Sequence, residues 1–358
     1  MARKKQQGNG SGTVYPRKNK DGKITSYLGA YYAPDGKRRT VSAKTKSACR
    51  DKLRQAMSDA DKGMVFDAGN LTVGQYLDTW LLTIKGTVRQ RTWERYEQLV
   101  RVHIKPALGH FKLKDLTRAH VKNLYGTLRN PRHTHITLHE ALSDAVADNL
   151  IPRNVSDGLK LWKPRKKEIN PLTPEQARAF LEAARGDRYY ALYVLAVYYG
   201  LRQGELLGLK WADLDLDTNT LQIRRTMSES RIGRIEEQPK NGKGRRIELS
   251  RTAVEALKAH REAYGGHELV FATKKGAAVN SSNLLHRSFK PLLKSCGVPQ
   301  IRFHDLRHTC ATIRFIKGQH PKRVSEILGH SSVAITLDIY SHVIPGMGGD
   351  DPMEDALS

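Results

Sequence analysis

The sequence predicts a multidomain, mainly α-helical protein with a small α+β N-terminal domain. An all-α second domain and an α-rich third domain with a three-stranded β insertion follow. The chain has 358 residues, enough for about two or three domains. Hydrophobic residues make up 39% of it, which is sufficient for packed cores. Runs of strand-forming residues bounded by turn residues occur at the N-terminus and again near residues 221–249, and helical periodicity dominates elsewhere.

The predicted domains span residues 1–64, 71–160 and 171–345, with a tail at 346–358. In the first domain we expect a helix from about Ser47 to Lys62 and three strands, at Thr13–Pro16, Thr25–Tyr32 and Arg39–Ser42. An exposed strand face rich in Arg, Lys and Tyr suits a DNA groove. A basic tail at residues 1–12 followed by a solubilising module is the simpler alternative.

Charge predicts the class of partner. The chain carries 61 Lys and Arg against 36 Asp and Glu, a net +25, and residues 1–64 hold 16 against 5, a net +11. Such an excess favours a polyanion, with nucleic acid as the first candidate, and a generally cationic surface as the alternative. Three scattered cysteines with no CxxC pair fit a reducing cytoplasm and indicate neither disulfides nor a cysteine zinc site. We expect no membrane segment.

The second domain is expected to be a compact set of four helices. Thr72 is placed to cap the first, whose apolar residues recur at helical spacing, and further helices are predicted at residues 91–102, 117–128 and 137–149. Basic residues on the polar faces are candidates for phosphate contact, although any one of them is more often only a solvated side chain: Arg89, Arg91, Arg95, Arg101, Arg118 and Lys122. A basic, proline-stiffened linker is expected at residues 160–170.

The third domain begins at a helix with Thr173 as its cap and Pro174 at its first position. Residues 189–199 form an apolar run too short to cross a bilayer and predict a helix buried on all sides. The β insertion is predicted from three strand candidates, Leu221–Met227, Arg234–Pro239 and Arg246–Leu249.

Four short segments of this domain carry reactive or charged side chains. They are Gly200–Leu206 around Arg202, His304–Thr309, Leu328–Ser332 around His330, and Leu337–His342 around Tyr340. Each is weak alone, since a lone arginine or tyrosine usually serves packing or a salt bridge. The pair His304 and His308 has the spacing of a zinc-binding helix, but the acid beside it is Asp instead of Glu, so a metal site is disfavoured.

In this order the four segments resemble the tyrosine recombinase, or phage integrase, family, integrase type with an N-terminal arm-type DNA-binding module. The resemblance implies a site-specific DNA recombinase that integrates and excises a mobile element or prophage. It implies Tyr340 as the nucleophile that forms a 3′-phosphotyrosyl intermediate, and Arg202 and Arg307 as the phosphate ligands. His304 would assist proton transfer with the tyrosine, and His330 would hydrogen-bond the phosphate.

The family also places a general-acid lysine on a β-hairpin, which corresponds here to residues 238–246. Lys240 precedes the turn and is the first candidate; Lys243 is the second, and both being plain turn lysines is the alternative. Because the phosphotyrosyl bond conserves the phosphodiester energy, neither ATP, nor a cofactor, nor a metal is expected, and activity should survive EDTA.

The resemblance implies double-stranded DNA as partner, at core and arm sites, with a tetramer on DNA and an accessory excision or DNA-bending protein as a further partner. The expected location is the bacterial cytoplasm. Two features depart from the family: residues 128–135 are short for a helix connection, and the chain after Tyr340 is brief and broken by Pro and Gly. Rival hypotheses are a type IB topoisomerase-like or resolvase enzyme without arm-site binding, a catalytically inactive DNA-binding regulator, and a metal-dependent hydrolase.

Overall fold

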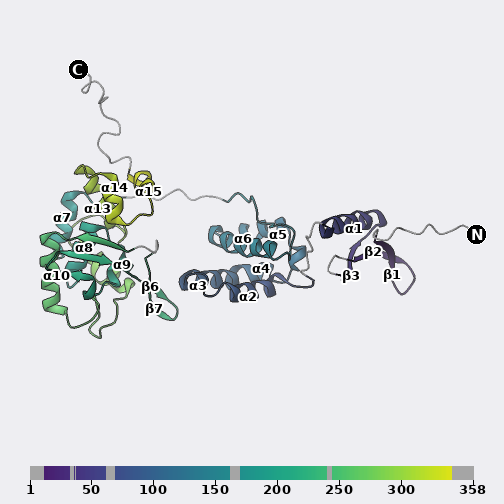
Figure 1. Ribbon diagram of the computed structural model, residues 1–358, viewed down its shortest axis with the longest axis horizontal. Coiled ribbons are helices and arrows are strands. Elements are labelled where there is room, and N and C mark those ends of the chain that lie inside the picture. Colours follow the sequence, from purple (N-terminus) through teal and green to yellow (C-terminus); the bar gives the residue numbers. More distant parts are fainter. Residues whose placement is uncertain are drawn as a thin grey trace, which may run out of the picture. The chain divides into compact units, whose positions relative to one another are not determined.

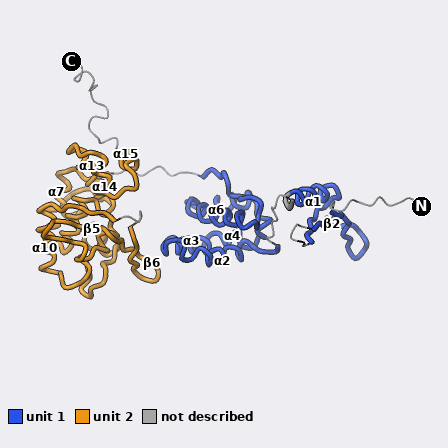
Figure 2. The backbone as a smooth tube through the Cα atoms, viewed as in Figure 1, with its two compact units in different colours: residues 1–163 blue, residues 164–358 orange. Residues whose placement is uncertain are grey.

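The structure is a computed structural model that describes residues 12–32, 36, 38–61, 69–161, 170–239 and 244–340, without the side chains of residues 59–61. The chain divides into two compact units, residues 1–163 and residues 164–358 (Figure 2). The predicted domain boundaries within this division stay predictions.

The N-terminal part of the first unit is a three-stranded antiparallel sheet with one helix on it (Figure 1). Its strands β1 (Thr13–Lys18), β2 (Ile24–Tyr32) and β3 (Arg38–Ala43) pair in the order β1-β2-β3, and α1 (Lys46–Asp61) packs against them. Cys49 and Leu53 of α1 are buried, and Leu53 lies against Gly29 in the central strand. The predicted small α+β module is therefore confirmed.

The sheet face away from α1 carries aromatic and basic side chains. Tyr15 and Arg17 alternate along β1 with residues that face the helix, and the register places Tyr32 and Arg38 opposite each other. Tyr32 is 74% exposed, and the Arg38 guanidinium donates to the Tyr15 hydroxyl at 3.4 Å. This face has the composition that the sequence predicted for a surface that meets DNA.

The rest of the first unit is helical, as predicted. Its elements are α2 (Val73–Thr83), α3 (Gln90–Leu99), the π-helical turn η1 (Val100–Ile104), α4 (Lys105–Leu108), the 3₁₀ turn η2 (Leu113–Asp115), α5 (Arg118–Gly126) and α6 (Arg132–Ala147). Thr72 caps α2 through a reciprocal pair of hydrogen bonds with Gln75. The apolar faces close on one core that includes Leu77, Ile104 and Leu142.

The short connection at residues 128–135 does not remove the fourth helix of this bundle. Helix α6 begins at Arg132, five positions before the predicted start at residue 137, directly after Pro131. Thr134 and Thr137 are buried on its inner face, so packing extends the helix through residues of low helix propensity. The six basic residues that the sequence singled out here are all exposed: Arg89, Arg91, Arg95, Arg101, Arg118 and Lys122.

The second unit is built around the apolar helix α8 (Tyr190–Tyr199), which packs against α7 (Pro174–Ala183), α10 (Arg251–Tyr264) and α13 (Asp305–Ile316) (Figure 1). Leu192, Val194 and Leu195 are fully buried, as expected for a helix covered on all sides. The remaining helical elements are α9 (Gln203–Leu207), η3 (Trp211–Asp213), α11 (Ser281–Leu284), η4 (Leu285–Phe289), α12 (Lys290–Ser295), α14 (Pro321–Leu328) and α15 (Val333–Tyr340).

The β insertion has two small sheets where the sequence predicted three strands. One sheet has the order β4-β5-β8, from β4 (Leu214–Asp215), β5 (Thr220–Ile223) and β8 (Arg245–Glu248). The other is a hairpin of β6 (Thr226–Ser230) and β7 (Gly233–Glu237). The predicted strand Leu221–Met227 is thus two strands, because Arg225 leaves the sheet to pair with Asp213 and Glu236.

Across the part of the chain that has described coordinates, every helix is too short or too polar to span a bilayer.

Candidate active site

Arg202 lies where the buried helix α8 gives way to the short helix α9. Gly200 ends α8 in the left-handed region, with φ +60°, and this turn directs the chain toward α9. Arg202 follows in extended conformation as the N-cap of α9. Its backbone N–H and its Nη1 both donate to the Glu205 carboxylate, at 2.9 and 2.8 Å. These two hydrogen bonds to Glu205, three positions along the chain, thus fix the orientation of the Arg202 guanidinium.

The Gly200→Ala substitution tests how tightly this turn is packed. A Cβ at residue 200 would approach Leu328 Cδ2 to 2.5 Å and Arg307 Cγ to 3.2 Å, in a conformation that L-residues avoid. We expect a loss of unfolding free energy of about 2–5 kcal/mol, measured by urea denaturation.

Gly297→Ala is the matched control for that substitution. Gly297 has φ +69° with no atom within 4 Å of its missing Cβ, so only the backbone cost of about 1–2 kcal/mol applies. Equal losses in the two variants would mean that contact with Leu328 and Arg307 plays no part.

Arg307 occupies the first turn of α13 and is 3% exposed. Its Nη1 donates to the carbonyls of Gly200, the C-cap of α8, and Leu328, the last residue of α14, at 2.9 and 2.6 Å, where the helix dipole is negative. Nη2 is buried and has no hydrogen-bond partner among the residues that the structure describes. Burial, reinforced by the nearby Arg202, lowers the pKa of Arg307 to about 9, so the guanidinium is still charged at neutral pH.

The Glu205 carboxylate accepts hydrogen bonds from two arginines. Besides Arg202, it accepts a bidentate pair of hydrogen bonds from Arg245 at the start of β8, at 2.9 and 2.8 Å. Burial opposes its ionisation, but the hydrogen bonds and charges of Arg245 and Arg202 lower the pKa of Glu205 to about 2. The Arg202 Nη2 further donates to the carbonyl of Gly329, the left-handed residue that ends α14, at 3.3 Å.

Glu205→Gln should destabilise the second unit strongly. The amide has nearly the shape of the carboxylate but removes the negative charge that pairs with both Arg202 and Arg245, and breaking such a buried pair costs about 3–5 kcal/mol of unfolding free energy. Glu182→Gln, which breaks an exposed pair with Arg185, should change stability by less than about 1 kcal/mol. Similar urea midpoints for the two variants would contradict this account.

The histidines of the motifs lie on α13 and after α14. His304 precedes α13, and its ring meets that of His308 edge to face, with centroids 5.2 Å apart. His330 follows Gly329, and its Nδ1 is 2.7 Å from the hydroxyl of Thr336, which is fully buried on α15. This contact fixes the orientation of the His330 ring through its Nδ1 atom. Burial, assisted by His308, lowers the pKa of His304 to about 4, and burial, assisted by Arg307, lowers that of His330 to about 3.

The lowered pKa values of His304 and His330 lead us to expect that the unfolding free energy of the protein falls at acidic pH. The unfolded chain binds protons on both near pH 6.5, whereas the native site binds them only near pH 4 and 3. Stability therefore declines as pH falls from 6.5 toward those values, since the unfolded state holds more protons in that window. Urea unfolding across this range should show a steeper decline for the wild type than for the double variant His304→Gln, His330→Gln. Parallel curves would show that neither histidine is held neutral.

Tyr340 is the last residue of α15 that the structure describes, and it is 2% exposed. It lies one helical turn from Thr336, so both point inward from the same face of α15. Its hydroxyl is 2.5 Å from Nδ1 of His308 on α13, and burial raises the pKa of the phenol. Tyr340 and His308 are 32 positions apart in sequence.

The structure brings together five of the six predicted site residues in the second unit, through the chain of contacts given above: Arg202, His304, Arg307, His330 and Tyr340. Lys240 and its alternative Lys243 lie outside the described residues, between β7 and β8. Sequence reasoning missed the roles of Glu205, Arg245 and Thr336, and weighed His308 only as a metal ligand. All four lie within or beside the quoted motifs. Glu205 and Arg245 are 40 positions apart and His308 and Tyr340 are 32 apart, whereas Thr336 is only six positions from His330.

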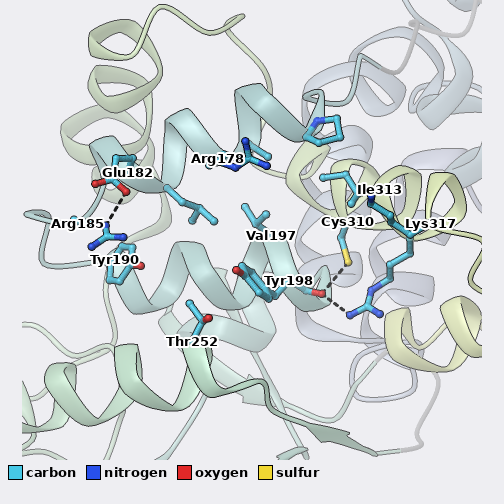
Figure 3. A pocket seen from close by; sticks show the side chains of 14 residues that line it. Arg178, Glu182, Arg185, Tyr190, Val197, Tyr198, Thr252, Cys310, Ile313 and Lys317 are labelled. Atoms are coloured by element: carbon cyan, nitrogen blue, oxygen red, sulfur yellow. Dashed lines mark hydrogen bonds and ion pairs between the residues drawn. The ribbon is translucent and has the colours of Figure 1, made fainter.

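A separate cavity of about 450 Å³ lies between α7, α8 and α13 (Figure 3). Apolar side chains such as Val197 and Ile313 line it together with basic ones such as Arg178. Cys310 borders it and donates to the carbonyl of Tyr198. None of the five predicted site residues that the structure describes lines this cavity, so it is distinct from the arginine and histidine site.

Comparison with known proteins assigns the family. The model of the phage integrase family matches residues 170–346, and that of the phage integrase N-terminal SAM-like domain matches residues 72–128. The chain is 31% identical to a tyrosine recombinase XerC-like protein of Caldanaerobacter subterraneus subsp. tengcongensis, over 86% of this chain and 88% of that protein. The chain belongs to the phage integrase family of tyrosine recombinases. The resemblance predicted from the four motifs is confirmed.

Solved structures of integrases have the same fold. The Tn1549 transposon integrase, residues 82–397, in complex with a circular intermediate DNA superimposes with a TM-score of 0.68 at 22% identity, over 80% of this chain and 99% of that one. A lambda integrase tetramer bound to a Holliday junction gives 0.58 at 20% identity, over 89% and 95%.

As a member of this family, the protein is a site-specific tyrosine recombinase that binds DNA and catalyses DNA strand transfer.

Proposed function

We propose that this recombinase cuts DNA by attack of Tyr340 on a backbone phosphate, forming a 3′-phosphotyrosyl bond and releasing a 5′-hydroxyl. The observation that carries the proposal is the arrangement of Arg202 and Arg307 at the carbonyl ends of α8 and α14. Two guanidinium groups held in this way can grip the non-bridging oxygens and neutralise the charge that grows on them. Nη2 of Arg307, which is buried and has no hydrogen-bond partner among the described residues, would donate to such an oxygen once the phosphate is bound.

The two histidines complete the proposed set. His330 hydrogen-bonds the phosphate through Nε2, because Thr336 occupies Nδ1 on the other side of the ring. His304 assists the proton transfer at the tyrosine through its edge contact with His308. Lys240, with Lys243 as the alternative, is the general acid that protonates the leaving 5′ oxygen.

We further propose that the enzyme integrates and excises a mobile element or prophage. The helical part of the first unit and the second unit clamp the core site, since exposed arginines line the former. The open face of the N-terminal sheet, with Tyr15, Arg17 and Arg38, binds separate arm sites. Four protomers act together on two duplexes, as the lambda integrase tetramer on a Holliday junction supports. An accessory excision or DNA-bending protein sets the direction.

The test is cleavage of a duplex that carries a nick just past the scissile phosphate, so that the released fragment diffuses away and the covalent complex accumulates. We expect a stable protein–DNA adduct that forms in the presence of EDTA. An adduct that requires a divalent metal would contradict the mechanism.

A second assay separates recombination from topoisomerase-like relaxation. Purified protein is given two DNA molecules with the target site, and footprinting maps the protected sequence. Recombinant products and two classes of protected site support an integrase with arm sites. Relaxation of supercoils without any recombinant product would favour the topoisomerase-like alternative.

A further inference from the structure

His308 makes the shortest contact to the Tyr340 oxygen that the structure records. Its Nδ1 lies 2.5 Å from that oxygen, and both rings are almost fully covered, at 7% and 2% exposure. The two residues come from different helices, α13 and α15, and the ring centroids are 5.7 Å apart. A contact this close between an imidazole and a phenol is a hydrogen bond, whose direction depends on the tautomer of His308.

Both partners of this hydrogen bond are neutral at pH 7. Burial lowers the pKa of His308, so its ring is neutral at pH 7, and burial raises the pKa of Tyr340, so its phenol keeps the proton. In the tautomer that carries the ring proton on Nε2, the Tyr340 O–H donates to Nδ1 of His308, and this is the tautomer that can take the proton. The phenol oxygen becomes a competent nucleophile only when this proton leaves.

The other ionisable groups near His308 are engaged elsewhere. Asp305, which precedes it by three positions, accepts from the backbone and the guanidinium of Arg302. His330 contacts Thr336 through Nδ1. His304 contacts the His308 ring, and Arg307 adds a positive charge that lowers the pKa of His308. Of these side chains, His308 is the base that touches the Tyr340 oxygen.

We propose that His308 is the general base for strand cleavage, with Nδ1 taking the Tyr340 proton as the phenolic oxygen bonds to phosphorus. This inference rests on the proposed role of Tyr340. The P–O5′ bond breaks in the same step, and O5′ takes a proton from the general acid. In rejoining, the DNA 5′-hydroxyl attacks phosphorus and gives its proton to that acid's conjugate base. His308 then returns the proton to the departing Tyr340 oxygen, so both groups end as they began.

Bound DNA makes His308 a better base than it is in the free protein. Burial disfavours the imidazolium, Asp305 favours it, and Arg302 and Arg307 disfavour it. A phosphate between the arginines adds negative charge beside the ring, and such a charge raises the pKa of a histidine. Proton removal from Tyr340 is therefore coupled to the arrival of the scissile phosphate.

The main test compares wild type and His308→Gln in single-turnover cleavage of the nicked duplex, at saturating DNA, between about pH 5.5 and 9. A glutamine can accept the Tyr340 hydrogen bond but cannot take the proton. We expect the variant to be slower by about 10²-fold or more at neutral pH, with DNA affinity unchanged. Its rate should rise about tenfold per pH unit where the wild-type rate is already level.

The controls for this test use the same substitution at another position and a second substitution at this one. His286→Gln changes an exposed histidine of η4 and should match the wild type at every pH. His308→Asn serves if the glutamine variant does not fold, as judged by its melting temperature and DNA affinity.

A trifluorinated tyrosine at residue 340 provides the decisive rescue. Its phenol is a much stronger acid than that of tyrosine, so even with its pKa raised by burial it loses the proton more readily without a base, and it should recover much of the rate lost in His308→Gln while changing the wild type little. A wild-type rate and pH profile in His308→Gln would overturn the proposal. So would a slow variant with a wild-type pH profile and no rescue, since that is a structural effect. An adduct in Tyr340→Phe would instead refute the proposed function.

Discussion

Tyr340→Phe will reduce formation of the covalent protein–DNA adduct to background. The phenylalanine ring fills the same buried site on α15 but lacks the oxygen that attacks phosphorus, and no rate remains when the only nucleophile is gone. The measurement is a denaturing gel of labelled nicked duplex after incubation with saturating protein. DNA affinity should stay at the wild-type value.

Tyr198→Phe is the matched control for this loss, because it removes a phenolic oxygen from the same unit at the border of the separate cavity. It should form the adduct at the wild-type rate. Retention of the adduct in Tyr340→Phe would show that another residue is the nucleophile.

Arg307→Lys will slow cleavage by about 10³-fold or more at saturating DNA. The guanidinium reaches the carbonyls of Gly200 and Leu328 with one nitrogen and leaves the other for the phosphate. An ammonium is one point of charge and cannot do both at once. The measurement is the single-turnover rate of adduct formation.

The control for Arg307→Lys is the same substitution at an exposed site. Arg178→Lys on α7 should leave the cleavage rate unchanged. A variant at residue 307 that keeps more than about a tenth of the wild-type rate would contradict the phosphate-binding role. Loss of DNA affinity with an unchanged saturated rate would assign Arg307 to binding of DNA in general.

Capping residues in the sequence predicted the starts of α2 and α7 correctly. Thr72 and Thr173 cap α2 and α7 with a glutamine three residues later, a pattern that depends only on neighbouring residues. The buried helix α8 was predictable because its apolar run has no polar face. The start of α6 was not predictable in this way, because its first turn is stabilised by the burial of Thr134 against other helices of the domain.

Motif order predicted five residues that the structure brings close together, but it did not predict the contacts that hold them there. Arg202 and Arg307 were expected to meet because the family resemblance requires it. Sequence gives no reason why Glu205 should join Arg202 to Arg245, which is 40 positions from Glu205, or why His308 should form a hydrogen bond with Tyr340. Such contacts arise where helix ends and strand ends converge in three dimensions, and nothing in local spacing records them.

The central claim is tested most directly by mapping the residue that carries the DNA. The adduct formed on nicked duplex is digested with protease and nuclease, and the peptide that retains a nucleotide is sequenced by mass spectrometry. The account predicts one modified peptide, joined at Tyr340 to a 3′-phosphate, with a free 5′-hydroxyl on the released strand. A nucleotide on any other side chain, or a bond through a 5′-phosphate, would contradict it.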